Sequence, residues 1–169
     1  VLGYNDGDDA AREKIRAFLA KRDLQSRSVF EQDITNSTAK AVENTEQFAP
    51  AQENATSFTT QFPGTRLAGQ MRSVAETIQI RQFLHVSRQM FYVTTGGYDT
   101  HSNQANTIGG LHAQLAAAIS SFREAMIELG EWNNVAVFTA SDFGRTTIDN
   151  GNGTDHGWGG HHFVAGGSV

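Results

Sequence analysis

The chain has 169 residues, of which 38% are apolar, and this is enough for one ordinary domain with a core. Its net charge is −5. Acidic and basic residues are interspersed, so no basic block predicts a nucleic-acid surface, and no apolar run of about 18 residues predicts a membrane span. The absence of cysteine excludes disulfides and thiolate zinc sites.

Two helices and a loop are predicted in the first third of the chain. Residues 8–22 begin acidic and end basic, which suits the helix dipole, and their apolar side chains share one face. Residues 28–48 also predict a helix, although they are rich in Thr, Asn and Gln. Residues 49–64 hold both prolines, Pro50 and Pro63, among small polar residues. We expect a loop there, serving as a lid or as a boundary between subdomains.

Helices and strands alternate in the rest of the chain. Residues 66–83 repeat apolar side chains at intervals of three and four, which predicts an amphipathic helix. Residues 90–95 (MFYVTT) are rich in β-forming side chains and end at two glycines, which predicts a buried strand. Residues 106–129 form the clearest helix, with Gly130 as its C-cap. A second buried strand is predicted at 135–139, and a third begins at 162–165.

This alternation predicts a fold class. Strand, helix and strand in sequence are typical of a βαβ unit, and continuous apolar strands are typical of a sheet covered on both faces. We therefore predict an α/β core over residues 66–169, with a parallel-rich sheet flanked by helices, and a helical and loop region of uncertain assignment over residues 1–65. Because the chain begins at Val1 and stops within an expected strand or turn, we expect a partial domain of a longer protein.

Three polar, glycine-rich motifs carry the candidate chemistry: GGYDTH at 96–101, SDFGRT at 141–146 and GTDHGWGGHH at 153–162. Two of them follow predicted strands, at whose carboxyl ends ligands of such sheets collect. Carboxylates and imidazoles are costly to hold there unless a cation satisfies them. We therefore predict a site for a divalent metal ion, with zinc, manganese, calcium and magnesium all compatible. The candidate ligands are Asp99, His101, Asp142, Asp155, His156, His161 and His162.

Each motif also has a plainer interpretation. Asp99 and His101 point the same way in an extended chain and could meet one cation, but Asp99 could instead cap the next segment. Asp142 and Arg145 could form a structural ion pair; in the functional interpretation Arg145 grips an anionic oxygen and is the candidate catalytic residue. The histidine-rich motif is costly as a mere loop, although a flexible glycine-rich loop with incidental histidines remains the alternative.

The three motifs, in this order and spacing, make residues 66–169 resemble the DUF1501 family of bacterial proteins, and residues 1–65 match it loosely. That family is similar to the alkaline-phosphatase/sulfatase superfamily. The resemblance implies an alkaline-phosphatase-like α/β sandwich with a metal site at its strand ends. It also implies hydrolysis or transfer of phosphate or sulfate esters.

The resemblance assigns roles by position. Asp99 and His101 correspond to the superfamily's aspartate and histidine pair after a strand, at a tighter spacing. Asp142 takes the place of a strand-terminal aspartate, but Phe143 stands where histidine is usual. His156, or one of the 161/162 pair, would then supply the missing ligand.

The expected function is therefore a metal-dependent hydrolase acting on phosphate or sulfate esters of an anionic small molecule or polysaccharide. The superfamily's nucleophile comes from a more N-terminal segment that this chain does not match. The alternative is accordingly a non-catalytic binding or surface protein that keeps the fold and at most a structural metal. Family members resemble proteins exported through twin-arginine signals, which implies a periplasmic or cell-surface location.

Overall fold

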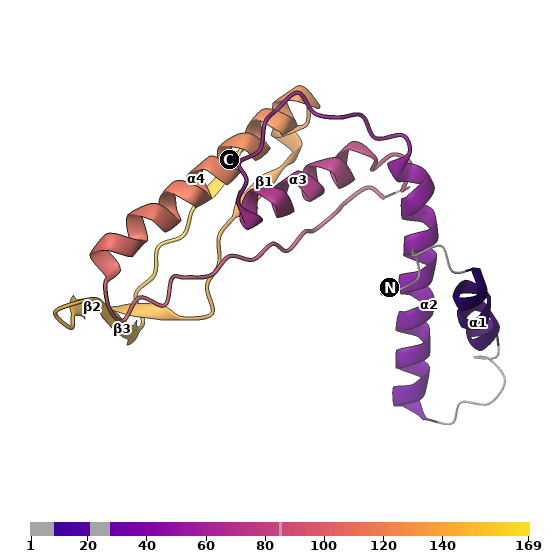
Figure 1. The fold of residues 1–169 in the computed structure, drawn as a ribbon, viewed down its shortest axis with the longest axis horizontal. Helices are drawn as coiled ribbons and strands as arrows, with labels where there is room; N and C mark the ends of the chain where they lie inside the picture. The colour runs from indigo at the N-terminus through magenta and orange to yellow at the C-terminus, as the bar shows by residue number, and fades with distance from the viewer. Residues whose placement is uncertain (1–8, 21–27, 85) are drawn as a thin grey trace. The chain divides into compact units, whose positions relative to one another are not determined.

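The computed structural model describes residues 9–20, 28–84 and 86–169. Contacts between Cα atoms divide the chain into two compact units. Unit 1 comprises residues 1–55 and 82–85, and unit 2 comprises residues 56–81 and 86–169. All three motifs lie in unit 2 (Figure 1).

Unit 1 contains helices α1 (Asp9–Ala20) and α2 (Val29–Gln52). The prediction of a helix at 8–22 is confirmed for the residues of α1, while residues 8, 21 and 22 lie outside the described residues. The Arg16 guanidinium of α1 donates two hydrogen bonds, 2.6 and 3.0 Å long, to the Glu46 carboxylate of α2. The ion pair is exposed, so it contributes little to stability.

Helix α2 runs further than predicted, because it continues through Pro50 to Gln52. The prediction of a loop from residue 49 is therefore wrong for its first residues. Pro50 lies in the last turn, where its missing N–H removes one helical hydrogen bond and the helix ends shortly afterwards. The many threonines are accommodated because their hydroxyls donate to carbonyls four residues earlier, as seen for Thr35, Thr38 and Thr45.

The core of unit 2 lies between α3 (Arg66–Gln79) and α4 (Gln104–Glu128), which run side by side in Figure 1. Buried side chains recur every three or four residues on both helices, as the periodicity predicted. The buried set is Leu67, Ala68, Met71, Ala75 and Ile78 with Ala118, Phe122, Ala125 and Met126. Helix α3 ends at Gln79, earlier than the predicted residue 83. Gly130 adopts φ 72° after α4, so the predicted glycine cap is confirmed.

The strands do not form the predicted parallel-rich sheet. Strands β1 (Ala136–Phe138) and β4 (Val164–Gly166) pair antiparallel, with Val137 opposite Ala165. Strands β2 (Gly144–Asp149) and β3 (Thr154–Gly157) form a second antiparallel pair, with Arg145 opposite His156. The α/β prediction is therefore wrong, as is the alkaline-phosphatase-like sandwich. The physical reason is that SDFGRT and the glycine-rich motif fold back on each other through a short turn, and a short turn joins antiparallel strands.

Residues 90–95 are extended but are not a strand of either sheet. Met90 and Tyr92 are 93% and 90% exposed, so the predicted burial is also wrong. The backbone of Thr94 pairs with a side chain rather than a strand: its N–H donates to Gln70 Oε1 at 3.0 Å, and its carbonyl accepts from Gln70 Nε2 at 2.8 Å. Val93 nevertheless packs against the α3–α4 core, so the run passes along that core.

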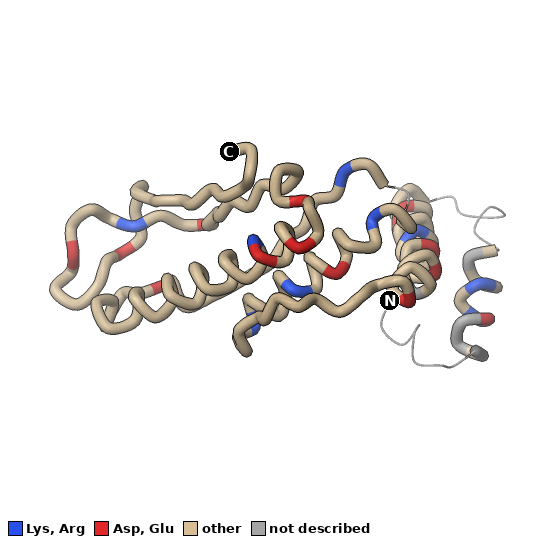
Figure 2. Tube along the Cα trace, turned by 90° about the horizontal axis from the view of Figure 1, so that it is seen from above, with Lys and Arg blue, Asp and Glu red and all other residues tan. Residues whose placement is uncertain are grey.

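Two broader expectations concern charge and membranes. Lys and Arg do not gather in one block along the described trace, as Figure 2 shows. None of the helices in the described ranges is long and apolar enough to cross a bilayer.

Candidate metal centre

The loop at 96–101 and the β2–β3 hairpin meet at one end of α4. The loop supplies Asp99 and His101, and strand β3 supplies Asp155 and His156. Residues more than 50 positions apart in the chain are thereby placed within hydrogen-bond distance. The convergence of the first and third motifs is a property of this fold and does not require a parallel sheet.

Three of these side chains direct ligand atoms at one point. His101 Nε2 lies 3.0 Å and His156 Nε2 lies 2.9 Å from the same oxygen, Asp99 Oδ1. One ligand atom from each residue lies within 4.8 Å of the others, which is compatible with a shared metal ion. The two imidazole rings stack with their centroids 5.0 Å apart. All three residues are exposed, so an ion could enter without rearrangement of the core.

The Asp99 carboxylate is ionised near neutral pH. A hydrogen bond from His156 is the largest cause that lowers the pKa of Asp99 below its ordinary value. Desolvation opposes it, and hydrogen bonding to Arg145 lowers the pKa further. A neutral imidazole with its lone pair on Nε2 would repel that carboxylate at 3 Å. The arrangement is satisfied either by a proton on Nε2 or by a cation between the nitrogen and the oxygen.

Asp155 does not reach the point where the other three side chains converge, and it contacts His101 instead. Its Oδ1 lies 3.0 Å from His101 Nδ1, on the side of the ring that faces away from Asp99. The hydrogen bond to His101 lowers the pKa of the Asp155 carboxyl below its ordinary value, with a further contribution from Asn150. A carboxylate that accepts from Nδ1–H leaves the Nε2 lone pair available, which is the usual way in which proteins orient a metal-binding histidine.

Arg145 reaches the centre from strand β2. One guanidinium nitrogen donates to Asp99 Oδ1 at 2.6 Å and to the Tyr98 carbonyl at 2.9 Å, and the other donates to the Thr154 carbonyl at 2.5 Å. Its Nε is buried and has no hydrogen-bond partner among the described residues. Arg145 therefore joins the loop to the hairpin and adds a positive charge beside Asp99.

Phe143 closes one side of the centre. Its ring stacks on His156 with centroids 4.6 Å apart and planes 7° apart, and the Arg145 guanidinium carbon lies 4.9 Å from the ring centroid. This is the position at which the resemblance led us to expect a histidine. The ring restricts the rotation of His156 and so helps to hold its Nε2 towards Asp99.

Glycine at 153 permits the close approach of hairpin and loop. A Cβ at this position would lie 2.3 Å from the Thr100 carbonyl oxygen and 2.6 Å from the His101 carbonyl carbon. The Thr154 N–H donates to the Thr100 carbonyl at 3.3 Å, and the Gln104 N–H donates to the Asn152 carbonyl at 3.1 Å. The turn between β2 and β3 therefore docks directly on the backbone that carries His101.

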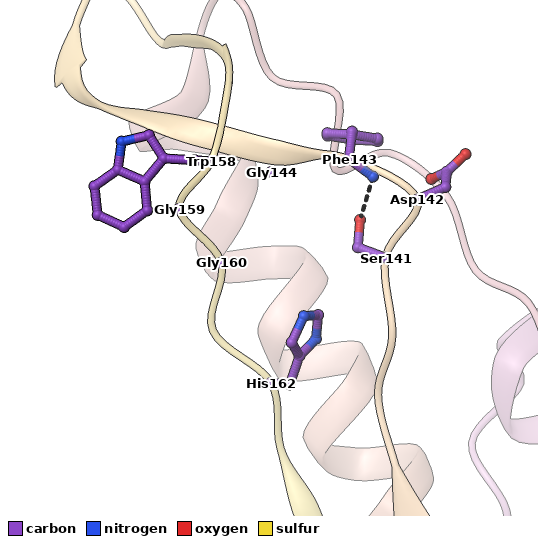
Figure 3. A pocket seen from close by; sticks show the side chains of 8 residues that line it. All are labelled: Ser141, Asp142, Phe143, Gly144, Trp158, Gly159, Gly160 and His162. Carbon is purple, nitrogen blue, oxygen red and sulfur yellow. Dashed lines mark hydrogen bonds between the residues drawn. The ribbon is translucent and has the colours of Figure 1, made fainter.

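Besides Asp155, the candidate ligands Asp142, His161 and His162 do not join this group. Among the described residues the group of converging ligand atoms consists of Asp99, His101 and His156. Asp142 and His162 instead line a neighbouring hollow of about 360 Å³, whose lining also includes Phe143, Gly144 and Trp158. In Figure 3 the Trp158 and Asp142 side chains lie on opposite sides of that hollow and point away from each other, and His162 lies below them in the view. His161 is exposed beside it.

Several residues that shape the centre carried no prediction of function. Asn150 belongs to an Asn-Gly-rich stretch whose recognisable signal is that of a turn. Gly153 opens the third motif, but its close contact with the loop at 96–101 was not predicted. Tyr98 contributes only its backbone carbonyl to Arg145, which a side-chain pattern cannot reveal.

Comparison with known protein families identifies the family of this chain. A family model described as "Protein of unknown function (DUF1501)" matches residues 2–169. No curated protein and no solved structure matches the chain.

Proposed function

From the premise that this chain belongs to the DUF1501 family, we propose that it binds a divalent metal ion through Asp99, His101 and His156 and uses it to hydrolyse phosphate or sulfate esters. One observation carries the proposal. Two imidazole nitrogens and a guanidinium converge on a single oxygen of one ionised carboxylate. Two imidazole nitrogens and one carboxylate form the kind of ligand set that binds a metal ion.

The donor set narrows the choice of ion. Two nitrogens and one oxygen suit zinc or manganese, whereas calcium and magnesium prefer sites made of oxygen. Three protein ligands also leave a position open to substrate or water, as in catalytic rather than structural zinc sites. We therefore propose zinc or manganese as the ion.

The residues around the ion have separate roles in this proposal. A divalent ion supplies Lewis acidity towards an ester oxygen and lowers the pKa of water. Asp99 and the two imidazoles hold it, and Asp155 fixes the orientation of His101. Arg145, beside Asp99, provides a positive charge for an anionic ester oxygen.

The class of ester comes from the family resemblance. We propose an anionic small molecule or polysaccharide ester as substrate, because a relationship to the phosphatase/sulfatase superfamily is suggested by the three motifs. The parallel sheet of that superfamily is no part of the proposal, since the sheets here are antiparallel. A periplasmic or cell-surface location is proposed on the same resemblance.

The proposal is tested by metal content and turnover in the full-length protein. Elemental analysis after zinc or manganese loading should find stoichiometric metal, which Asp99→Ala and His156→Ala remove. The exposed His112→Ala on α4 is the matched control and should retain it. Turnover of p-nitrophenyl phosphate or sulfate should follow metal content. A folded wild-type protein that stays metal-free in excess zinc and manganese would overturn the proposal.

A non-catalytic metal-binding protein is the second candidate function. In the described part of the chain, no serine or threonine hydroxyl hydrogen-bonds to Asp99, His101, His156 or Arg145. A covalent nucleophile is therefore not positioned by these contacts. Stoichiometric metal without turnover of either ester would favour this function.

A further inference from the structure

Residues 89–95 (QMFYVTT), which we name the edge run, form an extended segment of unit 2 that belongs to neither sheet. In Figure 1 this segment passes α3 and leads to the loop at 96–101. We propose that the edge run binds the edge run of a second copy of the chain, as an antiparallel pair of β-strands about a two-fold axis. The proposal concerns assembly and goes beyond the proposed function, because it needs no metal ion.

The backbone of the edge run has one free side. In the described part of the chain, the hydrogen bonds of this backbone are confined to Thr94, whose N–H and carbonyl both bond to the Gln70 side chain. In an extended chain the N–H and C=O of one residue point to the same edge, and those of its neighbours point to the opposite edge. The backbone groups of Phe91 and Val93 therefore face away from Gln70. A row of unpaired N–H and C=O groups is a template for another strand.

The edge run lacks the features that protect exposed strand edges. It contains no charged residue, no proline and no glycine, whereas natural edges are commonly protected by lysine, by proline or by a bulge. Its Met90 and Tyr92 side chains are almost fully exposed, while Val93 packs against the α3–α4 core. Two large side chains thus project into solvent from a run that the core holds in place, which is typical of a surface that accepts a strand.

The alternation of the backbone selects a register in which two copies match. Only residues whose backbone faces the free edge can exchange hydrogen bonds, so Phe91 must pair with an odd-numbered residue of the other copy. A two-fold axis at Phe91 places Phe91 opposite Phe91 and Met90 opposite Tyr92. This axis pairs both exposed side chains with each other. Aromatic pairs and sulfur–aromatic contacts of this kind stabilise antiparallel strands.

Charge permits this pairing with a second copy. Arg88 is the charged residue that directly precedes the edge run, and the same register places it opposite Thr94. The next charged residue is Asp99, which lies beyond the paired residues. No like charges therefore meet across the pair, where they would be destabilising. The segment of a second copy thus fits the free edge in hydrogen bonding, side-chain chemistry and charge.

The first measurement is the oligomeric state of the full-length protein in EDTA, by analytical ultracentrifugation between about 1 µM and 1 mM protein. We expect a dimer whose population rises with concentration. The double variant Met90→Lys/Tyr92→Lys places lysine opposite lysine on both sides of the axis, and it should weaken dimerisation by about 10-fold or more. Ile148→Lys replaces an exposed apolar side chain of β2 and is the matched control, which should dimerise as the wild type does. Circular dichroism checks that both variants fold.

The second measurement locates the axis by cysteine cross-linking. The 169 residues contain no cysteine, so a single introduced cysteine reports on its own neighbours. Opposite residues of an antiparallel pair have Cα atoms about 4.5–5.5 Å apart, which a disulfide can span. Under mild oxidation we expect Phe91→Cys to cross-link with its own copy. Met90→Cys should cross-link with Tyr92→Cys when the two proteins are mixed, in preference to its own copy.

Two kinds of result would overturn the inference. One is a protein that stays monomeric over the whole concentration range, as expected if another segment or another protein covers the edge run. The other is a dimer that persists in Met90→Lys/Tyr92→Lys or that cross-links without regard to position. Because EDTA removes metal ions, these results are independent of the proposed function.

Discussion

At the scale of single residues, the metal centre depends on a backbone contact that leaves no room for a side chain at position 153. Gly153 shows this most directly, because its Cα hydrogen faces the Thr100 and His101 backbone where a Cβ would overlap. The overlap is with backbone rather than with a flexible side chain, so the hairpin and the loop would have to separate. The close approach of Gly153 to this backbone places Asp155 and His156 near Asp99.

Gly153→Ala is therefore expected to cost about 1–3 kcal/mol in the free energy of unfolding and to weaken metal binding. Urea denaturation and zinc titration measure the two effects. Gly69→Ala in α3 is the control, since nothing lies within 4 Å of its Cβ position and alanine favours a helix. A Gly153→Ala protein that matches the wild type in both measurements would contradict this close approach.

At the scale of elements, the C-terminal end of α4 is held by side-chain and backbone hydrogen bonds. Glu128, the last residue of α4, accepts from the N–H groups of Thr59 and Thr60 and from the Thr60 hydroxyl. These bonds fasten the segment before α3 to α4. Bonding to the Thr59 backbone N–H is the largest cause that lowers the pKa of Glu128, to about 2 from 4.5.

The lowered pKa of Glu128 predicts how stability depends on pH. Because the folded-state pKa lies below the unfolded value, the ionised carboxylate stabilises the fold above 4.5, and this contribution is lost as the pH falls towards about 2. Glu128→Gln should lower the melting temperature at neutral pH, and the difference from the wild type should shrink across that interval. Glu124→Gln, on the same helix but paired with the neighbouring Arg123, serves as the control. An unchanged difference across the interval would be incompatible with this role.

Gly130 ends α4 in a left-handed conformation, with φ 72°. The N–H groups of Gly130 and Glu131 donate to the carbonyls of Ile127 and Met126 at 2.9 and 2.8 Å, which satisfies the end of the helix. Gly130→Ala should therefore lower the free energy of unfolding by about 1 kcal/mol, because an L side chain disfavours this conformation. Chemical denaturation measures it, and a neutral effect would show that the cap does not constrain the chain.

At the scale of the whole molecule, a metal ion would join segments that are distant in the chain. The loop at 96–101 precedes α4, while the hairpin follows the β1 strand. Hydrogen bonds dock the hairpin on the loop, and the three ligand side chains are exposed. An ion bound to Asp99, His101 and His156 would therefore stabilise only the folded arrangement.

We therefore expect zinc to raise the free energy of unfolding, by about 2.7 kcal/mol at a free metal concentration of 100 times Kd. A chelator should reverse the increase, and His156→Ala should abolish it. Calorimetry with and without zinc measures the shift. A wild-type shift that survives in His156→Ala would place the bound metal elsewhere.

The sequence by itself determined the local features of this protein. Periodicity located the helices and the buried faces of α3 and α4, and Gly130 marked the end of α4, because such signals arise between residues a few positions apart. The motifs also identified Asp99, His101 and His156 as candidate ligands.

The tertiary structure alone decided how the strands pair and which ligands meet. The prediction of a parallel sheet was wrong because the apolar content of residues 90–95 does not specify a partner strand. The Thr94 backbone is hydrogen-bonded to the Gln70 side chain instead. The sequence likewise could not show that Asp99 and His156 converge while Asp142 and His162 line another hollow. The distance between the loop and the hairpin depends on contacts such as that of Gly153 with Thr100. Those contacts are made between segments far apart in the chain, and no local pattern encodes them.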